Sequence, residues 1–200
     1  MILTYLTLYA IRTTENMIKK NVMMALTLFT AIQINAQTLV KDINPSSSSA
    51  WPMGLTQSGN MLFFSANDGI NGDELWRSDG SAAGTMMVKN IDSTAGNSIN
   101  FPFSFTDVNG TLFFRALDPI HSYELWKSDG TAAGTVLVKD INPGTGYSYP
   151  DNLIKFNNML FFTANNNING VELWKSDGTA AGTVMVKDVY QGPFSSNPSI

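Results

Sequence analysis

Two acidic residues recur at matching places in three similar segments of the chain. They are Glu74, Glu124 and Glu172, followed by Asp79, Asp129 and Asp177. A pair of carboxyl groups can hydrolyse a glycosidic bond, one acting as acid and the other as base or nucleophile. An active site is needed once, whereas this pair occurs three times. We therefore expect structural roles, with each aspartate accepting N–H groups of its own turn, and predict no catalytic residue.

One loop places oxygen atoms at alternate positions, as calcium-binding loops do. It spans residues 67–73, NDGINGD, and its candidate ligands are Asp68, Asn71 and Asp73. The corresponding residues 118–122 and 166–169 lack the same carboxylates. An ordinary polar turn is therefore the alternative, and no other cofactor is expected.

The chain has a single histidine, His121, and no cysteine. These counts exclude a multi-histidine metal site, disulfides and cysteine-based redox chemistry. No matched serine or cysteine context accompanies His121, as nucleophilic catalysis requires. We predict that the chain is not an enzyme.

Four aromatic residues lie in the segments that differ most between the copies: Trp51, Phe101, Tyr147 and Tyr149. Those segments are residues 44–52, 91–102 and 142–150. Variable loops on a rigid scaffold often form binding surfaces, and aromatic rings suit stacking on sugars or contact with a peptide. We predict that these four residues bind a glycan or protein ligand; packing of the loops onto the scaffold is the alternative.

The elements that must position these residues belong to a tandem repeat of about fifty residues. ELWRSDGSAAGT begins at Glu74, and ELWKSDGTAAGT begins at Glu124 and again at Glu172. An LFF block precedes each copy and a Val-Lys block follows it. The units are residues 37–85, 86–135 and 136–183, with a partial unit at 184–200.

Each unit reads as four short strands, and no helical periodicity is sustained after Gln37. The first strand is expected at residues 54–56, 103–107 and 152–156. Turns rich in Asn and Gly join it to the LFF strand. The ELW block forms the third strand, and the Val-Lys block forms the fourth. Its lysines, Lys89, Lys139 and Lys187, are expected to be solvated charges at the sheet edge.

The LFF strand indicates the architecture. Alternate side chains point to opposite faces of a strand, so Leu160 and Phe162 lie on one face and Phe161 on the other. Both faces are apolar and need cover, because burying a Phe side chain stabilises by roughly 1.5–3 kcal/mol. Four-stranded sheets stacked around an axis provide it. We predict an all-β fold, a partial β-propeller of about three four-stranded antiparallel blades.

Residues 38–43 repeat the fourth-strand sequence with no strands before it. In a propeller such a strand completes the last blade and closes the ring. Three complete units are too few for a ring, which typically has about 4–8 blades. We expect the chain to be a fragment of a larger ring; the alternative is a dimer of two chains that completes six blades.

The N-terminus has the layout of a secretory signal peptide. Lys19 and Lys20 precede an apolar stretch at residues 22–34, and Ala36 precedes the expected cleavage site. The apolar stretch is shorter than the roughly 20 residues that span a bilayer. We predict a signal peptide at residues 1–36 with translation starting at Met17, and no transmembrane segment in the mature chain. A membrane-anchored N-terminus is the alternative.

The charge balance disfavours two classes of partner. From Gln37 onward the chain has nine basic and fifteen acidic side chains and no basic cluster. Nucleic acid and anionic membranes are therefore not expected as partners. A hydrophobic content of 44% is ordinary for a globular protein.

The segment ELWKSDGTAAGTVLVKDINPG, from Glu124 to Gly144, resembles a repeat family common in large exported bacterial proteins. Many of these are similar to Bacteroidetes cell-surface proteins that end in a type IX secretion sorting domain. The resemblance covers residues 37–200 and implies a propeller-like fold and a secreted or cell-surface location. It implies no activity, and this chain departs from the pattern because it has no sorting domain.

These features together predict an exported, non-catalytic repeat protein that acts as a binding or adhesion module at the cell surface. One alternative is a fragment of a larger secreted hydrolase whose catalytic residues lie outside this chain. Another is a purely structural surface-layer repeat.

Overall fold

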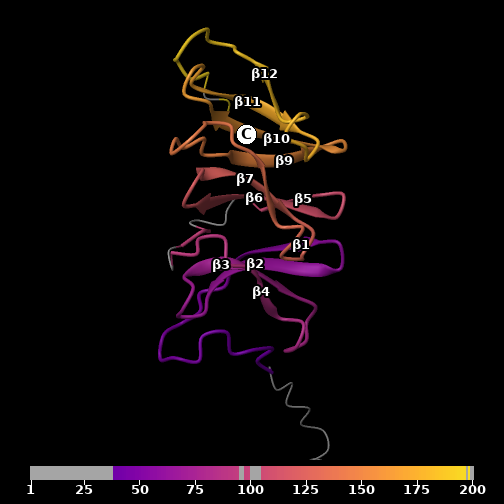
Figure 1. Cartoon of the computed structure of the whole chain (residues 1–200). Helices are drawn as coiled ribbons and strands as arrows, with labels where there is room; N and C mark the ends of the chain where they lie inside the picture. The colour runs from indigo at the N-terminus through magenta and orange to yellow at the C-terminus, as the bar shows by residue number, and fades with distance from the viewer. Residues whose placement is uncertain (1–37, 95–96, 100–104, 197, 199–200) are drawn as a thin grey trace, which may run out of the picture. The chain divides into compact units, whose positions relative to one another are not determined.

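The computed structural model describes residues 38–94, 97–99, 105–196 and 198. Within these residues there are twelve strands and no helix (Figure 1). The sheets lie in one compact unit, Val40–Ile200. The predicted signal peptide and Phe101 lie outside the described residues.

The strands form three four-stranded antiparallel sheets, each a meander of consecutive strands. The first contains β1 (Met53–Ser58), β2 (Met61–Asn67), β3 (Asp73–Ser78) and β4 (Met86–Lys89). The second contains β5 (Thr106–Val108), β6 (Thr111–Asp118), β7 (Ser122–Ser128) and β8 (Val136–Lys139). The third contains β9 (Asp151–Phe156), β10 (Met159–Asn165), β11 (Val171–Ser176) and β12 (Val184–Lys187). The predicted all-β fold with three four-stranded antiparallel sheets is confirmed.

Short turns join the first two strands of each sheet. Gly59, Asn109 and Asn157 adopt φ values of 57°, 56° and 55°. Two-residue hairpin turns need this left-handed conformation, which Gly and Asn adopt at the lowest cost. The Asn- and Gly-rich sequences between the first and second strands therefore fix the hairpins where they were expected.

The LFF strand is buried on both faces where a sheet has neighbours. Phe63, Leu75 and Val88 of the first sheet pack in one cluster with Phe114 and Trp126 of the second. A second cluster joins the second sheet to the third through Phe113, Leu125, Val138, Phe162 and Trp174. Neighbouring sheets therefore pack face to face, as the apolar pattern of the LFF strand predicts.

Residues 38–43 were expected to form a strand, and this prediction is wrong for the described chain, because they are irregular. Each sheet already contains its own fourth strand. No third strand is therefore left to pair with these residues.

The prediction that the fourth-strand lysines are solvated is wrong for two of the three. Lys89 Nζ donates a hydrogen bond of 2.8 Å to the Thr135 carbonyl, and Lys139 Nζ donates one of 2.8 Å to the Thr183 carbonyl. In each case the acceptor belongs to the next sheet, in the turn between its third and fourth strands. Only Lys187 is exposed as expected. The lysines therefore connect consecutive sheets.

Candidate binding surface

Three tyrosines gather at one end of the second sheet. Tyr123 is the second residue of the ELW strand β7, and Tyr147 and Tyr149 lie in the connection from β8 to β9. The centroids of the Tyr147 and Tyr149 rings lie 5.2 Å apart, and those of Tyr123 and Tyr149 lie 5.4 Å apart. These pairs are nearly parallel, at 16° and 23°. The result is one aromatic cluster, the tyrosine cluster, built from two separate parts of the chain.

The connection is held in place by hydrogen bonds from Ser148, which lies between two of the tyrosines. Ser148 N donates to the Tyr123 carbonyl at 3.1 Å, and Ser148 Oγ donates to the Glu124 carboxylate at 2.6 Å. Tyr149 has a φ of 45°, a conformation that costs energy for a bulky residue. The backbone therefore presents Tyr147 and Tyr149 on either side of a buried anchor.

The tyrosine cluster is exposed to solvent. Tyr147 is 48% exposed and Tyr149 is 52% exposed. The Arg115 guanidinium lies over the Tyr123 ring, 5.8 Å from its centroid, within the range of a cation–π contact. The surface thus combines broad aromatic area, phenol hydroxyls and a positive charge.

The tyrosine cluster occurs once although the scaffold repeats. The positions of Tyr123 and Tyr147 carry Asp73 and Asn97 at the first sheet and the connection after it, and Val171 and Ser195 at the third. At those two sheets a backbone N–H forms a hydrogen bond at the same site: Asp73 N donates to Asn97 Oδ1 and Val171 N donates to Ser195 Oγ. An aromatic surface therefore replaces a small polar contact at the second sheet.

The repeated glutamates are fully buried anchors. Glu124 accepts N–H hydrogen bonds from Ile141 at 3.0 Å and Asn142 at 3.2 Å, besides the O–H hydrogen bond from Ser148 Oγ. Glu74 binds the corresponding Ile91, Asp92 and Ser98. Burial raises the pKa of Glu74 and of Glu124 to about 7, against the opposing effect of these hydrogen bonds.

The repeated aspartates close the turns between the third and fourth strands. Asp129 Oδ1 accepts hydrogen bonds from Thr131 N at 2.8 Å and Thr131 Oγ1 at 2.7 Å. These bonds lower the pKa of Asp129. Asp79 and Asp177 make the same contacts with Ser81 and Thr179. The expectation that each aspartate serves its own turn is confirmed, and the two repeated carboxyl groups act in separate places.

Two of the three calcium candidates, Asp68 and Asn71, already accept hydrogen bonds through their side-chain oxygens. Asp68 accepts hydrogen bonds from the backbone of Ile70 and Asn71 and from the Asn71 side chain. Asn71 Oδ1 accepts one from Asn90, and Asp73 lies at the start of β3. No group of three or more acidic, histidine or cysteine side chains that would suit a metal occurs among the described residues.

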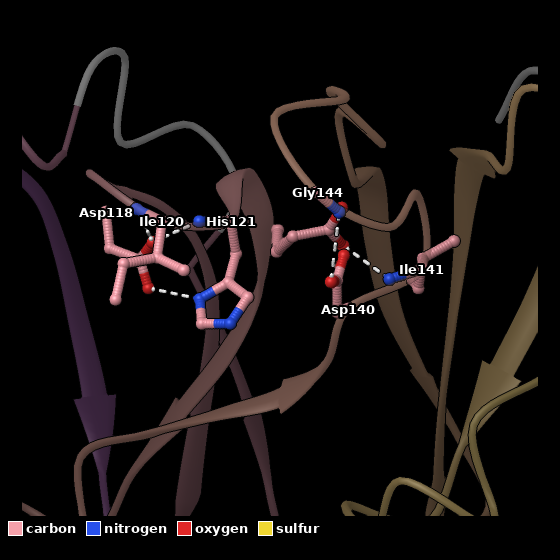
Figure 2. A network of polar contacts seen from close by, with 7 residues as sticks. Asp118, Ile120, His121, Asp140, Ile141 and Gly144 are labelled. Carbon is pink, nitrogen blue, oxygen red and sulfur yellow. Dashed lines mark hydrogen bonds and ion pairs between the residues drawn. The ribbon is translucent and has the colours of Figure 1, made fainter.

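The single histidine closes the equivalent loop of the second unit. Figure 2 shows the Asp118 carboxylate facing His121, with Asp118 Oδ2 and His121 Nδ1 2.8 Å apart. Asp118 also accepts N–H groups of Ile120 and His121. The counterpart in the first unit is the Asp68–Asn71 contact. The Asp118–His121 pair therefore occupies the same place in its loop as the Asp68–Asn71 pair does in the first unit.

The structure brings together two of the four predicted ligand-binding residues. Trp51 is 70% exposed and makes no ring contact with the tyrosine cluster in the described part of the chain. It holds the position of Tyr149 in the preceding connection and has a similar φ of 46°. The sequence did not single out Tyr123 or Arg115. The signal for Tyr123 was present, since the position directly before the repeated glutamate differs in every copy: Asp73, Tyr123 and Val171.

A shallow hollow of about 210 Å³ lies between the second and third sheets, at the turns between first and second strands. Asn109, Lys127, Asn158 and Asp177 line it. The side chains of Asn109 and Asn158 bond to each other, and Lys127 Nζ donates to the Gly178 carbonyl. The polar groups of the hollow thus serve contacts between the sheets.

The part of the chain that the structure describes contains no helix of the length and apolar character needed to cross a membrane. In comparisons with known proteins, the chain matches no family model, no curated protein and no solved structure.

Proposed function

We propose that this protein is an exported, non-catalytic binding module of the β-propeller type, which acts at the cell surface through the tyrosine cluster. The propeller geometry is supported by the first strands, since β1 lies against β5 and β5 against β9. In a propeller the first strands of successive blades line a common axis. The contact surface then lies on the rim that carries the connections between blades.

The observation that carries the proposal is the single occurrence of the tyrosine cluster on a repeated scaffold. The buried glutamates, the aspartate turns and the inter-sheet lysines recur in unit after unit, as structural features do. Tyr123, Tyr147 and Tyr149 do not recur, and two of them are half exposed. Tyrosine supplies large, rigid and amphipathic contact area at low entropic cost, which suits a glycan or a peptide.

The test is a screen of the chain on glycan and peptide arrays, in parallel with a Tyr147→Ala/Tyr149→Ala variant. We expect binding by the native chain and loss of binding by the variant. Ile168→Ala is the control, because Ile168 is 70% exposed in the loop between β10 and β11, which carries none of the three tyrosines. Binding to neither array, or equal binding by the double variant, would reject the proposal.

A further inference from the structure

The outward face of the third sheet repeats a face that is buried in the other two. Phe63, Leu75 and Val88 are buried beneath the second sheet, and Phe113, Leu125 and Val138 are buried beneath the third. Their counterparts in the third sheet are Phe161 and Leu173, which are half-buried, and Val186, which is 45% exposed. The third sheet therefore presents an apolar face of the kind that this fold covers with another sheet.

The first sheet has an open position that matches the half-buried Phe161 of the third sheet. The tip of the Phe63 ring lies 3.3 Å from the position of a Cβ built on Gly130, and that of Phe113 lies 3.1 Å from one built on Gly178. The matching residue of the first sheet is Gly80, where such a Cβ has nothing within 4 Å. We call the space beside each of these glycines a notch. The notches at Gly130 and Gly178 each receive a phenylalanine ring, and the notch at Gly80 is open.

The N-terminal segment, residues 40–50, contacts the first sheet in the same way as the fourth strand of one sheet contacts the next sheet. Lys41 Nζ donates to the Thr85 carbonyl at 2.7 Å, as Lys89 does to that of Thr135. Ile43 packs against the buried cluster of Phe64 and Trp76. What is missing beside this segment is the rest of a sheet.

We propose that two copies of this chain associate head to tail, the third sheet of each packing on the first sheet of the other. Phe161 of one copy then enters the notch at Gly80 of the second copy. Lys175 takes the place that Lys127 has within the chain, where its Nζ donates to the Gly178 carbonyl. The same side-chain contacts that join neighbouring sheets within the chain then join the two copies.

The N-terminal segment of each copy takes the fourth-strand place beside β11 of the other and displaces β12. The two sequences match, with VKDI at residues 40–43 and VKDV at residues 186–189. The backbone hydrogen bonds between β11 and β12 are therefore replaced by equivalent bonds between β11 and the N-terminal segment of the other copy. β12 is the least buried of the fourth strands, with Val184, Val186 and Lys187 all exposed.

A second copy fits because both halves of the contact lie in the same chain. A head-to-tail contact gives a closed ring or an open filament, depending on the rotation between copies. Each copy supplies three sheets, so two copies give six, within the usual range of about 4–8. Three copies would exceed that range, and the ring is therefore a dimer.

The first experiment measures the mass of the purified chain by light scattering over a range of concentrations. We expect a dimer that does not grow further. Leu173→Asp and Ile43→Asp should each give a folded monomer, as judged by circular dichroism, while Ile168→Asp in an exposed loop should stay dimeric. A monomer at every concentration, a mass that keeps growing, or a dimer that survives Ile43→Asp would overturn the proposal.

The second experiment uses the absence of native cysteine. Lys175→Cys and Ala82→Cys chains, treated with a short bismaleimide, should cross-link when mixed and not when treated separately. Lys127→Cys with Ala180→Cys in one chain is the matched control, since Lys127 reaches the turn that contains Ala180. Cross-linking of Lys175→Cys to itself would show face-to-face packing of two third sheets and would overturn the head-to-tail arrangement.

Discussion

The Ser148 hydroxyl donates a 2.6 Å hydrogen bond to the buried carboxylate of Glu124. The same serine accepts a backbone hydrogen bond of 2.9 Å from Asn165 in the third sheet. Ser98 repeats the arrangement with Glu74 and with Leu117 of the second sheet. Glu74 and Glu124 therefore each fix the connection that joins their sheet to the next one, and the tyrosine cluster stands on the second of these connections.

Replacing Glu124 with Ala should destabilise the fold strongly. Three buried donors, on Ile141, Asn142 and Ser148, would lose their acceptor. We expect a loss of about 3 kcal/mol in the free energy of unfolding, measured by urea denaturation. The control is Asp42→Ala at an exposed site, which should change it by less than about 0.5 kcal/mol. Equal effects of the two changes would show that Glu124 is not an anchor.

Stability should fall as the pH rises from about 4.5 to about 7. In this range the folded protein holds protons on Glu74 and Glu124 that the unfolded chain, with a pKa of 4.5, has released. The loss should be on the order of 3 kcal/mol for each glutamate. Denaturation at a series of pH values measures it, and Glu74→Gln should reduce the slope in this window. A stability that rises steadily from pH 4.5 to 7 would contradict the raised pKa values.

Acid should weaken the aspartate turns at lower pH. Hydrogen bonds from Ser81, Thr131 and Thr179 lower the pKa of Asp79, Asp129 and Asp177 below 3.8. Their contribution is present above pH 3.8 and is lost as the pH falls through the lowered values. Together with the glutamates this places maximal stability near pH 4. The Asp129→Asn variant should lose less stability on acidification than the native chain does.

The fourth-strand lysines provide a matched pair of substitutions. Lys139→Met removes the hydrogen bond to the Thr183 carbonyl of the third sheet and should cost about 1 kcal/mol. Lys187→Met changes an exposed lysine at the same strand position and should be nearly neutral. Thermal denaturation of both variants checks this expectation. Equal losses would show that the bond between the sheets contributes nothing measurable.

The glycines that receive phenylalanine rings provide another pair. Gly178 and Gly80 have φ values of 89° and 91°, so alanine is strained at both. Only at Gly178 does the added Cβ also press on the Phe113 ring, which should cost about 1 kcal/mol more. Denaturation of Gly178→Ala and Gly80→Ala in dilute protein isolates the contact between the sheets. Identical losses of stability in the two variants would show that the Phe113 ring does not contact Gly178.

Much of the fold was predictable because its signals are local. The two apolar faces of the LFF strand, the Asn and Gly turns and the aspartate turns all act within one unit or its nearest neighbour. The exposure of Trp51, Tyr147 and Tyr149 also followed from the variable segments that carry them. These features depend on strand alternation and turn chemistry, which can be read directly from sequence.

The remaining features depend on distances that the sequence does not give. The acceptor of Lys89 is the carbonyl of a residue 46 positions later, and nothing in the lysine's surroundings indicates it. The Glu124 carboxylate meets Ser148 across 24 positions. Tyr123 joins Tyr147 and Tyr149 only because that contact folds the connection back over β7. Residues 38–43 have a strand sequence but lack a partner, since pairing is decided by neighbours.

The most direct test of the binding role is a calorimetric titration of the best array ligand into the native chain, Tyr149→Ala and Ile168→Ala. The Tyr149 side chain is half exposed at the centre of the tyrosine cluster, so its removal should weaken affinity about tenfold or more. Ile168→Ala should bind as the native chain does. A Tyr149→Ala variant that keeps native affinity would contradict the account.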